Sequence, residues 1–308
     1  MICLGKGRPA KKAKTTLEKY SCIYEKPSRY YNSFSKIKRF PVSEKTFSWK
    51  VPFNNYKPKK YTDPEVLKMK PAEADPDIGD KSFKAIKFNQ LDGITDRRSS
   101  ILKKYDIEQS LPVNPCGRTG VAMRGSLPRW GPNHAVTLII TRWKRSHRGP
   151  ITYLSARVLQ FISIARTKKD WSIPTRIRNP GESVEEANLK LFQESALNGR
   201  NKEEASKNIK ELLNDALEKE LIYEGYLDDG RNTDNAWLET TAYSYHAGDG
   251  ELDEFDILAQ DEDMTTIWRD YAPHLPYGSI TKKLIDRAAA FYLEEKDLKV
   301  VAKNPHLI

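Results

Sequence analysis

The chain has 308 residues, of which 38% are hydrophobic and 31% are charged, so it is long enough to bury the core of one large domain or two smaller ones. No apolar run approaches the length of a membrane-spanning helix, and we expect no membrane span. The cysteines Cys3, Cys22 and Cys116 show neither CxxC nor histidine-paired spacing. We therefore expect neither a disulfide framework nor a zinc site, and a reducing compartment fits best.

The net charge of +10 is concentrated in the N-terminal part of the chain. Residues 1–60 carry 16 Lys and Arg against 3 acidic residues, which leaves residues 61–308 at −3. Because the folded part is not basic, binding of nucleic acid is not expected. The basic arm includes Lys11, Lys12 and Lys14 and is open to three interpretations: a flexible solvated tail, a nuclear-import-like patch or a targeting presequence.

Composition indicates three consecutive segments. Residues 1–40 have little periodicity and many turn formers, which is typical of a disordered arm. Residues 41–115 are expected to form a small N-terminal domain, in which residues 47–61 alternate aromatic with polar residues around two prolines, a pattern that predicts short strands. Residues 116–308 are expected to form the main domain.

A glycine-rich segment opens the main domain. Residues 117–134 contain four glycines and two prolines, which fits neither an ordinary helix nor a central strand. We expect an ordered loop that brings its backbone close to another segment; a linker is the alternative, although Arg, Trp and His stand where a linker favours Ser and Thr. Trp130 is expected to pack, and a single His134 is seldom catalytic without an orienting partner.

Beyond this loop, predicted strands alternate with predicted helices. The predicted strands are residues 135–142, 157–165, 171–174, 221–227, 236–245 and 264–269. The predicted helices are residues 184–198, 202–219 and 279–296. Strands mixed with three helices, without regular βαβ spacing, favour an α+β or mixed α/β sandwich over a Rossmann sheet.

Residues 171–198, WSIPTRIRNPGESVEEANLKLFQESALN, combine a turn with the start of a helix. Pro180 and Gly181 form the turn, and Ser183 with Glu186 makes a capping box. Taken alone, this pattern is that of a well-capped amphipathic helix after a loop.

The same segment resembles the Nudix box, in which a Gly, five residues, a Glu and seven residues precede Arg-Glu-aliphatic-x-Glu-Glu. The positions that match are Glu182, Phe192 and Glu194. The positions that are replaced are Arg176 at the Gly, Lys190 at the Arg, Leu191 at the first Glu of the trio and Ser195 at its third.

The segments that flank the box carry a longer resemblance. Residues 49–62, 114–145, 157–164 and 221–240 are similar to segments of the mitochondrial ADP-ribose pyrophosphatase family and of the ADP-ribose-sensing domain of melastatin-type cation channels. The resemblance spans residues 45–295. It implies a Nudix α/β/α sandwich behind a smaller N-terminal domain, with ADP-ribose bound in a cleft between them.

The implied reaction is attack of water on the pyrophosphate of ADP-ribose, which gives AMP and ribose 5-phosphate. Mg²⁺ or Mn²⁺ would relieve the repulsion between the nucleophile and the charged diphosphate, with box carboxylates as ligands. By resemblance, Glu194 and Glu182 are the catalytic and metal-binding residues. An equally good role for Glu182 is to hold the loop at the helix N-terminus.

Against this requirement the chain has lost most of the apparatus. Leu191 and Ser195 lie one helical turn apart where the metal belongs, so only Glu194 of the trio remains. Glu185 and Glu186 are rotated by about 120° or more from Leu191 and cannot substitute. Losing two ligands should lower the rate on the order of 10³-fold.

The implied recognition residues are better kept. By resemblance to the channel domain, Asp229, Arg231 and Tyr277 contact ADP-ribose, whereas Ser279 and Ile280 differ from the Asn and His of that domain. A guanidinium can fork onto phosphate or ribose oxygens. The structural alternatives are an Arg–Asp brace of the turn and a packed Tyr.

Two functional hypotheses follow. The first is an ADP-ribose diphosphatase that works weakly or through rearranged ligands, with one of the loop acids Asp228, Asp229 and Asp234 as base or replacement ligand. The second is a pseudoenzyme that binds ADP-ribose without cleaving it. If only ligands are missing, Leu191→Glu with Ser195→Glu should raise hydrolysis. We expect a monomer, inside the cell, in mitochondria if the resemblance and the basic arm extend to location and in the cytoplasm otherwise.

Overall fold

The computed structural model describes residues 31, 37–147, 149–153, 156–165, 171–196, 213, 218–248, 260–261, 264–275 and 277–293. Most of the predicted arm and most of the helix predicted at residues 202–219 lie outside this set. No helix within it is both long and apolar enough to cross a membrane.

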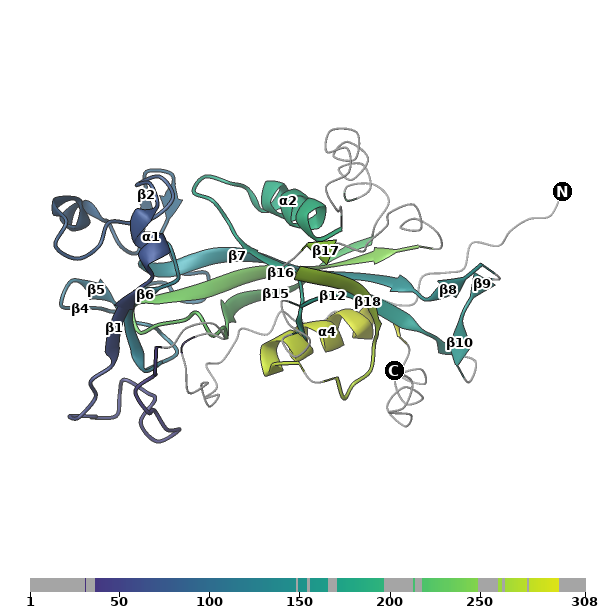
Figure 1. Ribbon diagram of the computed structural model, residues 1–308, viewed down its shortest axis with the longest axis horizontal. Helices are drawn as coiled ribbons and strands as arrows, with labels where there is room; N and C mark the ends of the chain where they lie inside the picture. The colour runs from purple at the N-terminus through teal and green to yellow at the C-terminus, as the bar shows by residue number, and fades with distance from the viewer. Residues whose placement is uncertain are drawn as a thin grey trace.

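An eight-stranded mixed sheet in the order β15-β16-β7-β12-β18-β17 forms the centre, with β13 added at β12 and β14 at β7 (Figure 1). Its strands are β7 (Gly131–Trp143), β12 (Leu159–Ala165), β13 (Trp171–Ser172), β14 (Thr175–Ile177), β15 (Glu218–Leu227), β16 (Ala236–Ala247), β17 (Gln260–Asp261) and β18 (Met264–Asp270). β7 and β16 pair in parallel, and nearly every residue of both is buried, as expected for strands covered on both faces. Strands occur in all six predicted ranges, although the strand predicted at residues 171–174 is limited to Trp171–Ser172.

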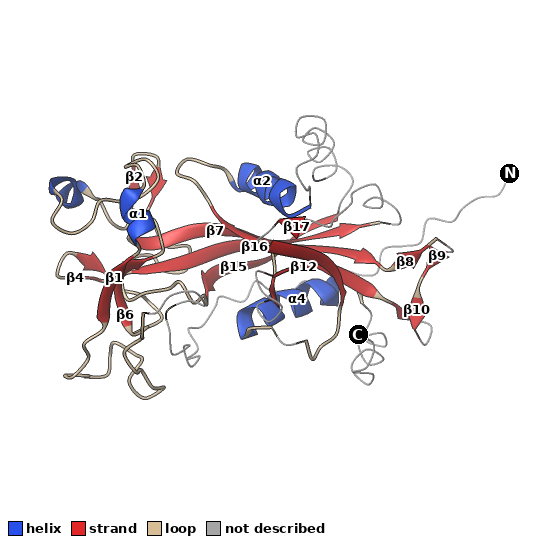
Figure 2. Cartoon of the chain, in the orientation of Figure 1, coloured by secondary structure: helices blue, strands red, loops and turns tan. Residues whose placement is uncertain are grey.

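Two helices cover opposite faces of this sheet, α2 (Val184–Ala196) and α4 (Ser279–Tyr292) (Figure 2). Successive side chains of a strand point to opposite faces, so Leu138 and Ile139 of β7 belong to different apolar clusters. Leu138 packs in the cluster of Leu191 and Phe192 from α2, and Ile139 in that of Leu284 from α4. The predicted α/β/α sandwich is confirmed.

Small elements lie at both ends of the sheet (Figure 1). At one end are β1 (Lys59–Thr62), α1 (Pro64–Lys68), the 3₁₀ helix η1 (Lys81–Ala85), β2 (Leu91–Asp92), β3 (Thr95–Asp96), β4 (Ile107–Glu108), β5 (Leu111–Pro112) and β6 (Val121–Gly125). Toward the other end are β8 (Arg145–Ser146), β9 (Gly149–Pro150), β10 (Thr152–Tyr153) and β11 (Ala156–Arg157). β1 pairs in parallel with β6, and the others form short antiparallel pairs.

The aromatic segment was predicted to form strands, which is wrong for residues 47–58. Their rings instead surround Arg118, whose guanidinium carbon lies 4.7 Å from the ring centroid of Trp49 and 5.4 Å from that of Tyr56. The same guanidinium donates hydrogen bonds to three backbone carbonyl oxygens, those of Thr46, Ser48 and Val51. These carbonyls are therefore satisfied without a sheet, and the chain turns around one cation.

The glycine-rich loop ends sooner than predicted, because a central strand begins at Gly131. The N–H of Gly131 donates to the carbonyl of Asn235 on the β16 side, so the nitrogen of Pro132 faces the opposite side. On that side β14 joins only from Ala135, and the missing N–H of proline leaves no bond unmade. The expectation of no central strand was therefore wrong for residues 131–134.

Parts of the predicted disordered arm are packed. Tyr31 and Arg39 are 0% and 7% exposed. The Tyr31 hydroxyl donates to the carbonyl of Arg231 at 2.7 Å, and a Cβ on Gly125 would lie 2.1 Å from that hydroxyl. Gly125 also has a φ of +57°. Only glycine combines that backbone with so close an approach, which confirms the predicted close contact of the loop.

Cys116 is disulfide-bonded. This bond goes against the expectation of no disulfide framework, since spacing along the sequence does not report which thiols meet in space. The inference of a reducing compartment therefore loses its basis.

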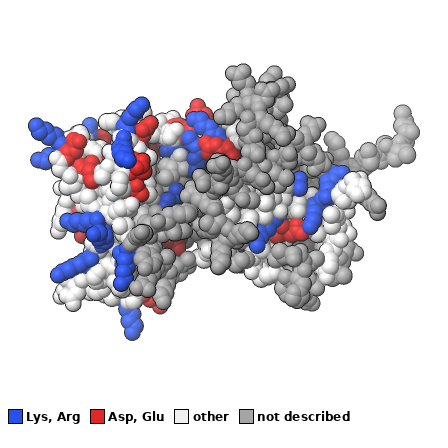
Figure 3. All heavy atoms as spheres, in the orientation of Figure 1, with Lys and Arg blue, Asp and Glu red and all other residues white. Residues whose placement is uncertain are grey.

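Charged side chains of both signs share the surface. On the face shown in Figure 3, the described Lys and Arg side chains lie among Asp and Glu. This mixture agrees with the charge of −3 of residues 61–308.

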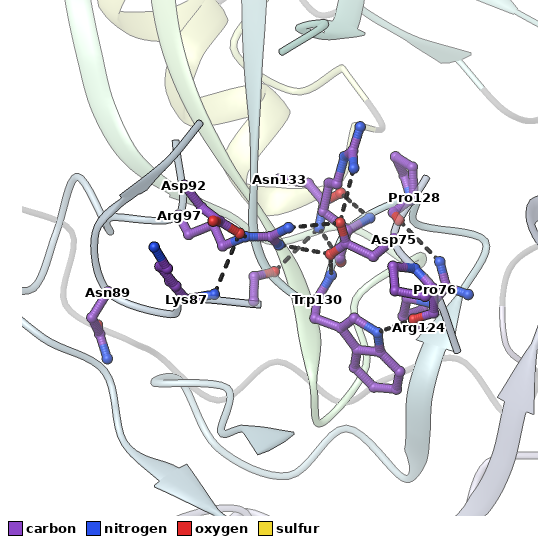
Figure 4. A network of polar contacts seen from close by, with 12 residues as sticks. Asp75, Pro76, Lys87, Asn89, Asp92, Arg97, Arg124, Pro128, Trp130 and Asn133 are labelled. Carbon is purple, nitrogen blue, oxygen red and sulfur yellow. Dashed lines mark hydrogen bonds and ion pairs between the residues drawn. The ribbon is translucent and has the colours of Figure 1, made fainter. Parts of the chain in front are cut away.

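One buried carboxylate holds the N-terminal elements against the start of β7 (Figure 4). The Asp75 side chain is 1% exposed and accepts both terminal nitrogens of Arg97, at 2.7 and 2.8 Å, and one of Arg129, at 2.8 Å. It also accepts a hydrogen bond from the backbone N–H of Trp130. Arg97 forms a second ion pair through its Nε, with Asp92. Burial opposes ionisation, but the arginines outweigh it and hold the pKa of Asp75 below its usual range.

We expect Asp75→Asn to lower the free energy of unfolding by about 3–5 kcal/mol, because two largely buried guanidinium groups lose their counter-charge. Urea denaturation followed by circular dichroism measures the change. Asp96→Asn is the matched control, since its ion pair with Arg98 is 39% and 61% exposed and such pairs contribute little. Equal losses in the two variants would contradict the assigned role of Asp75.

Candidate functional site

The Nudix-like segment forms a strand, a tight loop and a helix. In β14, Arg176 pairs with Val136 of β7. After the turn at Gly181, which has a φ of +76°, the Ser183 hydroxyl accepts the N–H of Glu186, and the Glu186 carboxylate accepts the N–H of Ser183. The predicted capping box is confirmed, and it fixes the start of α2 beside β7.

Glu182 lies at the centre of this segment as a buried carboxylate, with 4% of its side chain exposed. Its Oε2 accepts from Arg176 Nη1 at 2.7 Å and from the backbone N–H of Asn179 at 2.9 Å, and its Oε1 accepts from Lys190 Nζ at 2.6 Å. Burial by itself would raise the pKa of Glu182, but these donors lower it to about 2. The carboxylate therefore joins β14, the loop and α2.

Arg176 lies between the two carboxylates that the box retains. Besides the contact with Glu182, its Nε is 3.4 Å from Oε1 of Glu194, whose side chain is 58% exposed. Lys190, counted among the replaced positions, nevertheless keeps an ion pair with Glu182. The box thus retains two carboxylates and two cations, and the cations come from replaced positions.

The other replaced positions face the interior. Leu191 is 4% exposed, and it packs with Ala187 and Phe192 in the cluster under α2. Ser195 is 3% exposed. An apolar side chain therefore fills the place where the resemblance puts the first carboxylate of the trio.

The predicted recognition residues Asp229 and Arg231 lie in the connection between β15 and β16. Arg231 forms a two-pronged ion pair with Asp229, with Nε–Oδ1 and Nη2–Oδ2 distances of 2.8 and 2.9 Å. The two side chains are 33% and 24% exposed. The Arg–Asp brace of the turn is thus present, and contact with a ligand stays a prediction.

Tyr277 lies just before α4 and is half-buried. Its hydroxyl is 2.8 Å from the Ser163 hydroxyl, and its ring meets Phe161 edge-on. Arg269 lies 5.5 Å from the ring centroid. Burial raises the pKa of Tyr277. These contacts hold Tyr277 against β12, whereas the side chain of Arg231 pairs within its own turn.

The loop acid Asp234, weighed as a base or metal ligand, is instead 4% exposed. One oxygen accepts the N–H and hydroxyl of Thr119, at 2.7 and 2.8 Å, and the other accepts the Tyr56 hydroxyl at 2.6 Å. Burial raises the pKa of Asp234 to about 6, opposed by these bonds and by Arg39. Asp234 therefore connects three chain segments. The other loop acid, Asp228, lies beside the turn and is half-buried.

A cavity of about 670 Å³ opens between the box loop and the N-terminal elements. One wall is formed by residues 177–183 and by the start of β7, including His134, whose Nε2 is buried without a partner among the described residues. The other wall includes Met69, Leu91 and Ile94, which are 44%, 58% and 68% exposed. This apolar wall was not predicted from the sequence, in which its one signal is Ile94 next to Gly93.

Comparison with known proteins connects this geometry to a family. Residues 42–131 match the family described as "NUDT9-like, N-terminal domain". The chain is 42% identical over 249 residues to "ADP-ribose pyrophosphatase, mitochondrial" of Rattus norvegicus, a match that covers 78% of this chain and 70% of the relative. The chain belongs to the Nudix family of the mitochondrial ADP-ribose pyrophosphatase type.

The chain is also similar to one part of a much longer protein. The chain is 37% identical over 264 residues to "Transient receptor potential cation channel subfamily M member-like 2" of Nematostella vectensis, which covers 83% of this chain and 17% of the channel. Overlap with solved structures is loose, as for the NUDIX domain of Shewanella oneidensis NrtR complexed with ADP ribose, with a TM-score of 0.33, 13% identity, and coverage of 52% of this chain and 88% of that one.

Nudix hydrolases generally use a divalent metal, so we asked whether the box residues of this family member suit one. Hard cations take about six oxygen ligands. Both oxygens of Glu182 already accept bonds from cations, and Glu194 lies near Arg176. The described residues contain no group of three Asp, Glu, His or Cys side chains that could hold a metal ion. The described box therefore does not fit a divalent metal.

We expect the stability contributed by Asp234 to depend on pH. Its folded pKa of about 6 exceeds the ordinary aspartate value of 3.8, so the neutral form stabilises the fold below about pH 4 and this contribution is lost as pH rises through 6. Relative to Asp234→Asn, the free energy of unfolding of the wild type should fall by on the order of 3 kcal/mol between pH 4 and pH 7. Urea titrations of both proteins at several pH values measure the difference, and a constant difference would contradict the prediction.

We expect Leu191→Glu to destabilise the protein by on the order of 3 kcal/mol or more, because it buries a carboxylate among apolar side chains. Gln193→Glu on the same helix introduces the same carboxylate at a half-buried polar position and should cost less than about 1 kcal/mol. The double variant Leu191→Glu/Ser195→Glu should gain no hydrolysis while Arg176 remains. A folded double variant that turns over substrate would show that ligands alone were missing.

Proposed function

We propose that this chain is an ADP-ribose-binding Nudix module with little residual hydrolysis. Support for the ligand comes from the mitochondrial relative, whose name specifies ADP-ribose. The observation that supports weak turnover is the position of the Arg176 guanidinium between Glu182 and Glu194.

Several described groups suit a ligand with a charged diphosphate and polar sugars. The cleft between the box loop and the N-terminal elements has the size of a small-ligand site. Arg231 is not among the residues that line this cleft, but it is one-third exposed in its turn and can share its guanidinium between Asp229 and a phosphate or ribose oxygen. His134 offers an unpartnered ring nitrogen at the cleft wall.

The residues of the box argue against efficient cleavage. Hydrolysis of a diphosphate needs an activated water and compensation for charge at phosphorus, which divalent metals supply with several kcal/mol of stabilisation. Here Glu182 is held ionised by its own cations and Leu191 is apolar. Each 1.36 kcal/mol is a tenfold change, so turnover should be on the order of 10³-fold below that of a relative with an intact box.

The alternative is an ADP-ribose diphosphatase that reaches AMP and ribose 5-phosphate through rearranged groups with Mg²⁺ or Mn²⁺. The name of the mitochondrial relative favours it. The contacts of Arg176 and the burial of Leu191 favour the binding module. A mitochondrial location has the support of the same relative, and a monomer stays a prediction.

One experiment separates the two functions. Calorimetry with ADP-ribose should show saturable binding, and chromatography of the same samples with Mg²⁺ or Mn²⁺ should show AMP forming on the order of 10³-fold more slowly than with an intact-box relative. Turnover within about tenfold of that relative would establish the enzyme instead.

A variant pair tests the recognition residue. Arg231→Gln should weaken ADP-ribose binding by about tenfold or more, because a charge-assisted hydrogen bond is lost. Arg145→Gln makes the same change in the exposed strand β8 and should leave affinity unchanged. No binding by the wild type under any condition would overturn both functions.

A further inference from the structure

Two of the replaced box positions, Arg176 and Lys190, carry positive charges that neutralise the box carboxylates. Arg176 takes the place of a residue without a side chain, and its guanidinium contacts Glu182 at 2.7 Å and approaches Glu194 to 3.4 Å. Lys190 contacts the other oxygen of Glu182 at 2.6 Å. Two carboxylates at adjacent sites would repel each other without such a counter-charge.

We propose that the Arg176 guanidinium takes the place of the divalent cation at this helix, so that the chain binds the diphosphate of its ligand without metal. The inference rests on the proposed function for the identity of that ligand. In this proposal Arg176, and not a metal ion, provides the positive charge at the diphosphate, so Arg176 determines which ligand binds.

The geometry of Arg176 suits this role. Its side chain is 17% exposed, and two of its nitrogens are directed at the carboxylates through Nη1 and Nε. Within the described part of the chain, Nη2 makes no hydrogen bond. Arg176 itself is not among the residues that line the described cavity, but its partner Glu182 and the adjacent Ile177 are. A guanidinium donates in a rigid planar fork, and the donors on the edge away from the carboxylates are the ones that phosphate oxygens would accept from.

The surroundings keep this charge in place. Arg176 is anchored by the pairing of β14 with β7, and Glu182 by Asn179 and Lys190. A metal at the same position would have to displace the guanidinium from a carboxylate that is 4% exposed. Leu191 offers it no further oxygen ligand, because it is buried in the apolar cluster under α2.

The test exchanges one cation for another. ADP-ribose is titrated by calorimetry into wild type, Arg176→Gln and Arg176→Lys, each in EDTA and in MnCl₂. The wild type should bind equally well, within about twofold, in both buffers, because no metal takes part. Arg176→Gln should bind about tenfold or more weakly in EDTA, since it loses a charge-assisted donor.

Two comparisons guard against a merely structural effect. Arg176→Lys keeps the charge and should retain more affinity in EDTA than Arg176→Gln does, which general loosening of the loop would not produce. Arg145→Gln at the far end of the sheet should match the wild type in both buffers. Wild-type affinity that falls tenfold in EDTA, or full affinity of Arg176→Gln in EDTA, would overturn the inference.

A second measurement needs no nucleotide and so separates this inference from the proposed function. Electron paramagnetic resonance of Mn²⁺ titrated into the wild type should show no site that Glu182→Gln abolishes. If such a site appears, Arg176 does not replace the metal, whatever ADP-ribose does. If ADP-ribose fails to bind and the Mn²⁺ site is also absent, the proposed function is wrong while the exclusion of metal by Arg176 stands.

Discussion

The charge of Glu182 determines how the box is built. A carboxylate that is 4% exposed is costly to keep ionised unless it is paired and hydrogen-bonded. Arg176 on β14 and Lys190 on α2 provide that pairing from opposite sides, and Asn179 provides it from the loop. Strand, loop and helix therefore hold one arrangement, and the chemistry of the site follows from which cations occupy it.

A second buried carboxylate does the same for the facing wall of the cleft. Asp75 joins Arg97 of the N-terminal elements to Arg129 and Trp130 just before β7. The cleft is thus bounded by two segments that are each fixed to the sheet through a buried ion pair. Its shape therefore depends on electrostatic contacts at both sides.

The sequence predicted the features that local pattern determines. Hydrophobic periodicity predicted the strands and α2 and α4, and the capping box of Ser183 and Glu186 formed as expected because its partners are three residues apart. The family resemblance, and not any pattern, supplied the ligand.

Contacts between residues that are far apart in the sequence could not be predicted from it. Asp75 meets Arg97 and Arg129 across separations of 22 and 54 residues, and no spacing rule announces such pairs. Lys190 was counted as a replaced position because it differs in residue type from the Arg of the Nudix box. The ion pair with Glu182 depends on the positive charge, which Lys190 also carries. Pro132 was taken as a strand breaker because its open neighbouring side is visible only in the assembled sheet.

The burial of Leu191 limits which single substitutions the box tolerates. A carboxylate at position 191, without other changes, would place a charge in the apolar layer under α2, and replacing Arg176 alone would remove a partner of Glu182. Each of these changes by itself is therefore expected to give a less stable protein. A box with the family's residues requires several substitutions at once.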